Sequence, residues 1–113
     1  DLRADSVTYG KWYGVELTEE NKKQFLIPEG FAHGFLVLSD VAEFCYKVND
    51  FWHPNDEGGM AWNDPDIGIE WPALKGEYHG SPAAEGYTMA DGTPLTLSDK
   101  DQKWLGLKEM FKF

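Results

Sequence analysis

The sequence is 113 residues long, the size of a single domain with a modest hydrophobic core. Hydrophobic residues make up 42% of it and aromatic residues 15%, which is the composition of a globular protein rather than of a disordered one. Ten basic residues against 20 acidic residues give a net charge of −10. This charge would repel a phosphate backbone, so nucleic acid is excluded as a partner.

The single cysteine and the hydropathy pattern indicate the compartment. Cys45 has no second cysteine to pair with, and its apolar neighbours predict a small buried side chain in a reducing environment. No stretch approaches the ~18 apolar residues of a membrane span, and no signal peptide is visible. We therefore expect a cytoplasmic protein that does not contact a membrane.

The first half of the chain has the pattern of short β-strands. Alternation and β-forming residues predict strands over residues 11–17, 24–27, 32–38 and 42–48. Between the first two, Thr18 is an N-cap residue followed by acidic residues, which predicts one helical turn at most. Pro28 and Gly30 then predict a tight turn before the third strand.

The second half contains more turn signals and ends in a helical pattern. Residues 53–59 are predicted to be a loop, residues 62–66 a turn, and residues 72–94 a long surface excursion without periodicity. Ser98 is then a good N-cap.

Trp104, Leu107 and Phe111 follow Ser98 at helical spacing, and Lys112 suits the helix C-terminus. Strands followed by one helix predict an all-β fold, an antiparallel sandwich or barrel with a short C-terminal helix.

Two residues in the strand region could do chemistry. His33 lies in a Pro-x-Gly-x-x-His pattern that resembles the second conserved motif of cupin barrels, in which the His points inward; the alternative is a hydrogen-bonded structural His. A metal would need two further His and a carboxylate, and no such set is present, so we expect no metal site. Tyr46 lies on the next predicted strand and could donate a proton, or could be a core residue.

Three further candidates have ordinary structural explanations. Asp101 stands three residues after Ser98, where a carboxylate can complete a capping box. Lys100 has the pattern of a solvated surface cation, and Glu57 lies in a Gly-flanked loop where solvation is the simplest interpretation.

Five segments together resemble a known family. In order and spacing, the chain is similar to dTDP-4-dehydrorhamnose 3,5-epimerases over Gly-Lys-Trp-Tyr-Gly-Val-Glu-Leu (10–17), residues 27–39, residues 43–52, Trp-Asn-Asp-Pro-Asp-Ile-Gly-Ile-Glu-Trp-Pro (62–72) and Leu-Ser-Asp-Lys-Asp (97–101). The resemblance covers nearly the whole chain. It implies a metal-free, cofactor-free epimerase in one partial cupin-type jelly-roll domain over residues 1–113.

The resemblance also assigns roles to individual residues. It implies catalytic roles for Tyr46, as the proton donor, and for Asp101, as the partner that orients a histidine base. It implies substrate contacts for His33, Glu57 and Lys100. Trp52 stands in an aromatic pair where the family more usually has two tyrosines, and we expect it to wall the site. The family's Arg-Gly-x-His motif, which supplies the base, is expected upstream of Asp1, so that the chain would be the C-terminal two-thirds of such a protein.

The implied reaction is epimerisation at C3 and C5 of dTDP-4-dehydro-6-deoxy-D-glucose in dTDP-L-rhamnose biosynthesis, by a homodimer. Residues 73–94 are longer than in typical members, which leaves the local loop geometry open. Two alternatives stay open for the function: a non-catalytic cupin barrel fragment, and a related C3-only epimerase or ketoisomerase of nucleotide sugars.

Overall fold

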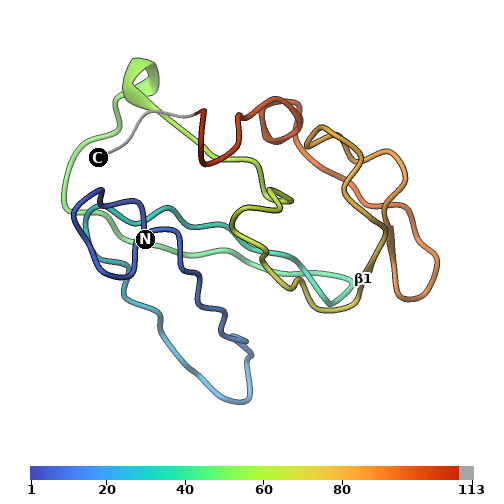
Figure 1. Ribbon diagram of the computed structural model, residues 1–113. Helices are drawn as coiled ribbons and strands as arrows, with labels where there is room; N and C mark the ends of the chain where they lie inside the picture. Colours follow the sequence, from blue (N-terminus) through green and yellow to red (C-terminus); the bar gives the residue numbers. More distant parts are fainter. Residues whose placement is uncertain (110–113) are drawn as a thin grey trace.

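Regular secondary structure begins only at Pro54 in this computed structural model, which describes residues 1–109. Four short elements follow: the 3-10 helix η1 (Pro54–Asp56), the strands β1 (Leu74–Lys75) and β2 (Thr88–Met89), and the 3-10 helix η2 (Lys100–Gln102). The strands form an antiparallel pair in which Leu74 lies opposite Met89. Most of the chain outside these elements runs as irregular coil (Figure 1). An antiparallel sheet with few helical residues agrees with the predicted all-β class.

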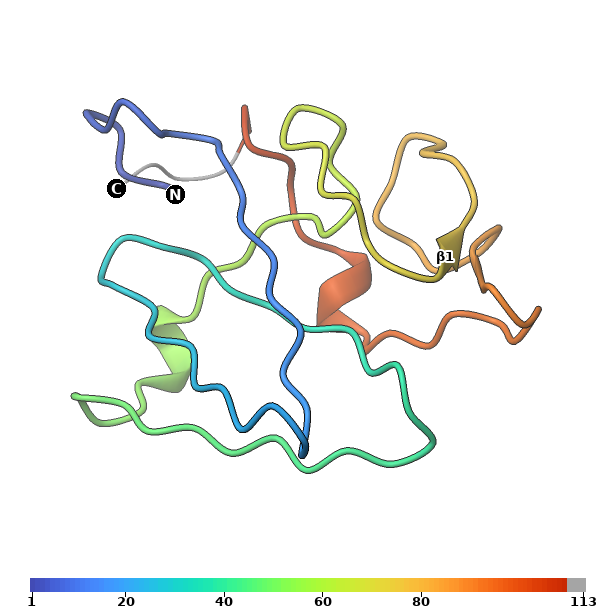
Figure 2. The ribbon, with the colours of Figure 1, turned by 90° about the horizontal axis from the view of Figure 1, so that it is seen from below.

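The four segments predicted as strands in the first half are not strands, and that prediction was wrong for this structure. Within residues 1–109 no backbone hydrogen bond joins residues 32–38 to residues 42–48. The rings of Phe35 and Phe44 stack across the gap with centroids 4.3 Å apart, while the two backbones lie apart (Figure 2). Alternation specifies which face of a strand is apolar, but a strand forms only when a neighbour accepts and donates its backbone hydrogen bonds. Cys45 is exposed rather than buried for the same reason.

The predicted turn at Thr18 is confirmed. The Thr18 hydroxyl accepts a hydrogen bond from the backbone N–H of Asn21 at 2.9 Å, and the Asn21 side-chain oxygen accepts one from the Thr18 N–H at 3.0 Å. This reciprocal pairing satisfies two backbone donors that the turn would otherwise leave free. A single turn results, as the acidic run after the cap predicted.

Residues 72–94 are not a featureless excursion, because they contain both strands. Gly76 allows the chain to leave β1: its φ is +132°, and a Cβ there would lie 2.7 Å from the Tyr87 ring. Tyr87 is buried, and its carbonyl accepts a hydrogen bond from the Leu95 N–H at 3.2 Å. The sequence lacked a periodic signal here because each strand is only two residues long.

Apart from Leu2, the buried apolar residues of the described chain lie in this C-terminal half. The full set is Leu2, Ala61, Tyr87, Leu95 and Leu107. Trp62 packs edge-on against Tyr87 with ring centroids 4.7 Å apart, and its indole N–H donates to the Pro82 carbonyl at 2.7 Å.

Asp64 ties the turn after Trp62 to the C-terminal segment. Its side chain is buried, at 6% exposure, and its Oδ2 accepts a hydrogen bond from the Leu107 N–H at 2.6 Å. Ala61 adds a backbone bond to the Leu105 carbonyl at 2.9 Å. A buried carboxylate is tolerated only when its oxygens are satisfied, so these two bonds fix where residues 105–107 run.

The predicted C-terminal helix shortens to η2. The N-cap of η2 is Asp99, one residue later than the predicted Ser98, although the Ser98 hydroxyl still accepts a hydrogen bond from the Asp101 N–H at 3.4 Å. The helix then ends at Gln102, since Leu107 is held by Asp64 and Trp104 turns toward Gly59. Phe111 and Lys112 of the predicted helix lie outside the described residues. Among residues 1–109, no helix is long and apolar enough to cross a membrane.

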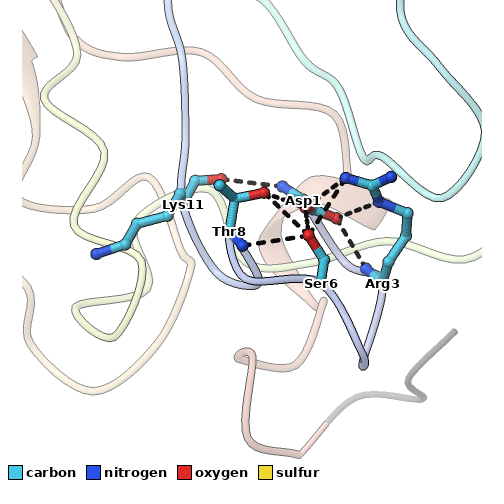
Figure 3. A network of polar contacts seen from close by, with 5 residues as sticks. All are labelled: Asp1, Arg3, Ser6, Thr8 and Lys11. Atoms are coloured by element: carbon cyan, nitrogen blue, oxygen red, sulfur yellow. Dashed lines mark hydrogen bonds and ion pairs between the residues drawn. The ribbon is translucent and has the colours of Figure 1, made fainter.

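A polar network orders the first eleven residues. The Asp1 carboxylate accepts hydrogen bonds from the Arg3 guanidinium at 2.9 Å and from the hydroxyls of Ser6 and Thr8 (Figure 3). Leu2 donates its backbone N–H to the Gly30 carbonyl at 3.0 Å. The Leu2 bond attaches this ordered N-terminal segment to the tight turn that precedes His33.

Candidate functional site

Three of the six predicted site residues meet at the surface, where the loop around η1 contacts the start of η2. Glu57 accepts a hydrogen bond from the Trp52 indole N–H at 2.8 Å through one carboxylate oxygen. Its other oxygen lies 3.7 Å from the Lys100 ammonium. Lys100 is the first residue of η2, so the contact joins parts of the chain more than 40 residues apart. We call Trp52, Glu57 and Lys100 the surface triad.

The loop that carries Glu57 is shaped by η1. Pro54 fills the first position of this helix, where its missing N–H costs nothing, and Asp56 donates its backbone N–H to the His53 carbonyl at 3.0 Å. This one turn reverses the chain between Trp52 and Glu57, which brings the indole within reach of the carboxylate. The loop prediction for residues 53–59 is thus correct apart from the 3-10 turn.

Lys100 is the member of the surface triad whose positive charge would attract an acidic or anionic ligand. The side chains of Glu57 and Lys100 are 43% and 62% exposed, and an exposed ion pair of this kind stabilises a fold by less than about 1 kcal/mol. The pair therefore matters for the positions of the side chains more than for stability. The Glu57 carboxylate holds the Lys100 ammonium with one oxygen and the Trp52 indole with the other.

Asp101 lies next to the surface triad on η2 and has a different partner. Its Oδ1 accepts a hydrogen bond from the indole N–H of Trp104 at 3.2 Å. The Trp104 ring lies directly against Gly59, two residues after Glu57. Neither Trp104 nor Gly59 was singled out from the sequence, because Trp104 fitted the apolar face of a helix and Gly59 fitted a loop.

Tyr46 and His33 stand apart from this cluster. Tyr46 is 70% exposed and packs against Phe44 with ring centroids 5.2 Å apart. His33 is exposed too. Across residues 1–109, no hydrogen bond, ion pair or ring contact joins either residue to Glu57, Lys100 or Asp101. The structure thus brings together the predicted residues from Trp52 onward, but not those of the predicted strands.

Two cavities lie near the core rather than at the surface triad. One, of about 280 Å³, lies between aromatic residues that include Trp62, Trp71 and Tyr87. The other, of about 320 Å³, is lined by Gln102 at the end of η2 and by Trp104, which follows η2. No predicted site residue lines either cavity, so the surface triad is an open surface site in this structure.

The Asp91 carboxyl group, which lies outside the surface triad, has a pKa below its ordinary value. The pKa of the Asp91 carboxyl is lowered because the Thr93 side chain and the Thr93 backbone N–H, at 2.9 Å, donate hydrogen bonds to it. Since its folded pKa is lowered, the stability that Asp91 contributes is lost as the pH falls through that value.

In the part of the chain that the structure describes, no group of three or more His, Cys, Asp or Glu side chains could hold a metal ion.

Comparison with known proteins gives the context for these residues. Residues 1–109 match the family model described as dTDP-4-dehydrorhamnose 3,5-epimerase. A protein of that name from Methanothermobacter thermautotrophicus is 46% identical over 109 residues, which is 96% of this chain and 50% of the relative. One from Escherichia coli K12 is 44% identical over 112 residues, which is 99% of this chain and 51% of the relative.

A third relative carries a different name. The dTDP-4-dehydrorhamnose 3-epimerase of Streptomyces niveus is 36% identical over 109 residues, which is 96% of this chain and 44% of the relative. The chain spans about half the length of the curated relatives that it matches, a smaller share than the two-thirds expected from the sequence. No solved structure matches the chain.

Proposed function

The chain belongs to the dTDP-4-dehydrorhamnose 3,5-epimerase family, and from that membership we propose that its protein epimerises dTDP-4-dehydro-6-deoxy-D-glucose at C3 and C5. The product would be dTDP-4-dehydro-L-rhamnose, a step of dTDP-L-rhamnose biosynthesis in the cytoplasm. The observation that best supports this proposal is the surface triad. Trp52, Glu57 and Lys100 come from separate segments, and a substrate-contacting role was expected for each of them.

The reaction needs groups that move protons and hold an anionic ligand. The ketone at C4 acidifies the C–H bonds at C3 and C5, so a base can remove each proton and leave an enolate. A proton that returns on the opposite face inverts the carbon, and a phenol such as Tyr46 is a suitable donor there. No metal or redox step is needed. We therefore propose a metal-independent, cofactor-independent epimerase.

Each predicted residue has a proposed task. Lys100 contributes an ammonium for the negatively charged substrate, Glu57 holds that ammonium, and Trp52 walls the site with an indole fixed by the same carboxylate. His33 contacts the substrate. Asp101 orients the base, which the family pattern places in the part of the protein that this chain does not span. We propose that the complete protein closes residues 1–113 into a single cupin-like barrel, in which Tyr46 and His33 reach the same cavity.

The direct test is turnover with the proposed substrate. We expect a protein of the relatives' full length that contains this chain to form dTDP-4-dehydro-L-rhamnose, with the same rate before and after treatment with a metal chelator. Residues 1–113 alone serve as the comparison, and a fragment without its base should form none. If a chelator abolished the activity and Zn²⁺ or Fe²⁺ restored it, the metal-independent mechanism would be wrong.

A second candidate function is epimerisation at C3 only. The Streptomyces niveus relative, which matches 96% of this chain, is named as a 3-epimerase. Product analysis separates the two candidates, because a C3-only enzyme would leave the configuration at C5 unchanged. Non-catalytic behaviour of the full-length protein would instead favour the barrel-fragment alternative.

We propose that the active protein is a homodimer. Large apolar side chains are exposed over the segments predicted as strands: Tyr13, Leu26, Phe35 and Val48. Exposed apolar side chains along strand-forming segments are normally covered by another sheet or subunit. Sedimentation of the full-length protein at micromolar concentration should give twice the monomer mass. A stable monomer under these conditions would contradict the proposal.

A further inference from the structure

The Asp101 carboxylate is held by a residue that the family resemblance did not assign. We propose that Trp104 is a positioning residue, whose indole N–H fixes the orientation of the Asp101 carboxylate. We propose further that Gly59, because it has no side chain, leaves the space in which the indole lies. The inference rests on the proposed role of Asp101 in orienting the base. It adds two residues whose contribution acts through Asp101.

Two hydrogen bonds fix the backbone around Asp101. Its N–H donates to the Ser98 hydroxyl at 3.4 Å, and η2 closes with the Lys103 N–H donating to the Lys100 carbonyl at 3.1 Å. At Lys103 the chain leaves the helix, with φ −125° and ψ −6°. This exit turns Trp104 back along the helix, so that its indole N–H meets the Asp101 carboxylate from the C-terminal side.

The carboxylate is anchored through one oxygen and open at the other. Oδ1 accepts the Trp104 indole N–H at 3.2 Å, whereas Oδ2 has no hydrogen-bond partner among residues 1–109. An ionised carboxylate can accept several hydrogen bonds, so Oδ2 is available to a donor such as the N–H of a histidine. A residue that orients a base needs this combination, because an unanchored carboxylate would sample several rotamers.

Gly59 determines where the indole lies. A Cβ at this position would stand 2.5 Å from Cδ2 and 2.6 Å from Nε1 of Trp104, closer than any real Cβ contact. Adding a methyl group would therefore displace the atom that donates to Asp101. No left-handed backbone conformation is recorded at Gly59, so the constraint is one of space.

The neighbouring glycine provides a matched control. A Cβ at Gly58 would meet nothing within 4 Å, and its backbone is not in the left-handed region either. Replacing either glycine with alanine changes the unfolded chain in the same way. Any difference between Gly59→Ala and Gly58→Ala therefore reports the contact with Trp104.

The test compares Trp104→Phe, Gly59→Ala and Gly58→Ala in the full-length protein, by steady-state kinetics. A hydrogen bond to a charged group is worth a factor of about ten or more in an equilibrium. We expect Trp104→Phe and Gly59→Ala each to lower kcat about tenfold with KM unchanged, and Gly58→Ala to leave both unchanged. If Gly59→Ala matched Gly58→Ala in kcat, or if Trp104→Phe raised KM alone, the positioning role would be wrong.

A spectroscopic readout keeps the inference testable apart from activity. The indole N–H resonance of Trp104, assigned from its loss in Trp104→Phe, should shift in Asp101→Ala and Gly59→Ala and stay in place in Gly58→Ala. An indole resonance that is unchanged in Asp101→Ala would overturn the contact itself. If the contact is present but Asp101→Asn leaves turnover unchanged, the proposed role of Asp101 fails instead, and the positioning role with it.

Discussion

Replacing Tyr46 with Phe is expected to lower the rate of epimerisation about 10²–10⁴-fold while removal of the substrate proton continues. The substitution deletes only the hydroxyl that would return a proton to the substrate. Within residues 1–109 this hydroxyl makes no hydrogen bond, and the ring that packs against Phe44 is kept, so the fold should be unaffected. The measurement is product formation alongside deuterium uptake into recovered substrate in D₂O.

Tyr13→Phe is the matched control for this variant. Tyr13 is another exposed tyrosine packed against a single phenylalanine, Phe25, with ring centroids 6.0 Å apart. Its loss of a hydroxyl should leave both product formation and deuterium uptake unchanged. Normal turnover in Tyr46→Phe would show that Tyr46 is a packing residue and not the proton donor.

Replacing Asp101 with Asn is expected to depress deuterium uptake and product formation together. Both begin with the same proton removal, and the base loses the carboxylate that orients it, so we expect a loss of about 10²–10⁴-fold, the range for positioned acid–base catalysis. The Asn side chain can still accept the Trp104 indole N–H and fills the same space. Lost activity would thus reflect the missing charge rather than lost packing.

Asp99→Asn tests whether any nearby negative charge matters. Asp99 lies two residues earlier at the start of η2, and its side chain makes no hydrogen bond within the described residues. This variant should retain normal exchange and product formation. Unchanged exchange in Asp101→Asn would instead support the capping interpretation of Asp101, in which the carboxylate serves only the helix N-terminus.

The features predicted correctly from sequence are those that a few neighbouring residues determine. Thr18 accepts a hydrogen bond from the backbone N–H three residues later, which depends on no distant contact. Ser98 accepts a bond of the same kind, although the N-cap itself is Asp99, one residue later than predicted. The turn at residues 62–66 is local in the same sense, since Asp64 accepts the backbone N–H of Asp66 at 3.1 Å. Such signals are readable because the partner lies within the same window of sequence.

The features that sequence could not give depend on distant partners. The strands predicted over residues 32–38 and 42–48 need partner strands for their backbone hydrogen bonds. The alternation of apolar and polar residues does not identify those partners. Asp64 accepts a hydrogen bond from the backbone N–H of Leu107, which lies 43 residues away. No sequence signal indicates that a carboxylate in a turn will be buried. Gly59 and Trp104 are 45 positions apart. Their spacing shows no pattern, although their contact decides where Asp101 points.

The candidate site was predicted from family resemblance more than from physics. Local patterns alone described Glu57 and Lys100 as solvated, and both are indeed half-exposed. The resemblance placed them together at one substrate, and the structure brings them within 3.7 Å of each other. Physical reasoning explains what it missed: an exposed ion pair adds little to stability, so folding alone gives no reason to expect it.

We propose that this chain is part of an enzyme that inverts two carbons beside a ketone. The most direct measurement is the full-length protein with dTDP-4-dehydro-6-deoxy-D-glucose in D₂O, with deuterium located by NMR. If this proposal is right, we expect deuterium at both C3 and C5 of an L-configured product. Deuterium at C3 alone, or no exchange at either carbon by a folded full-length protein, would contradict it.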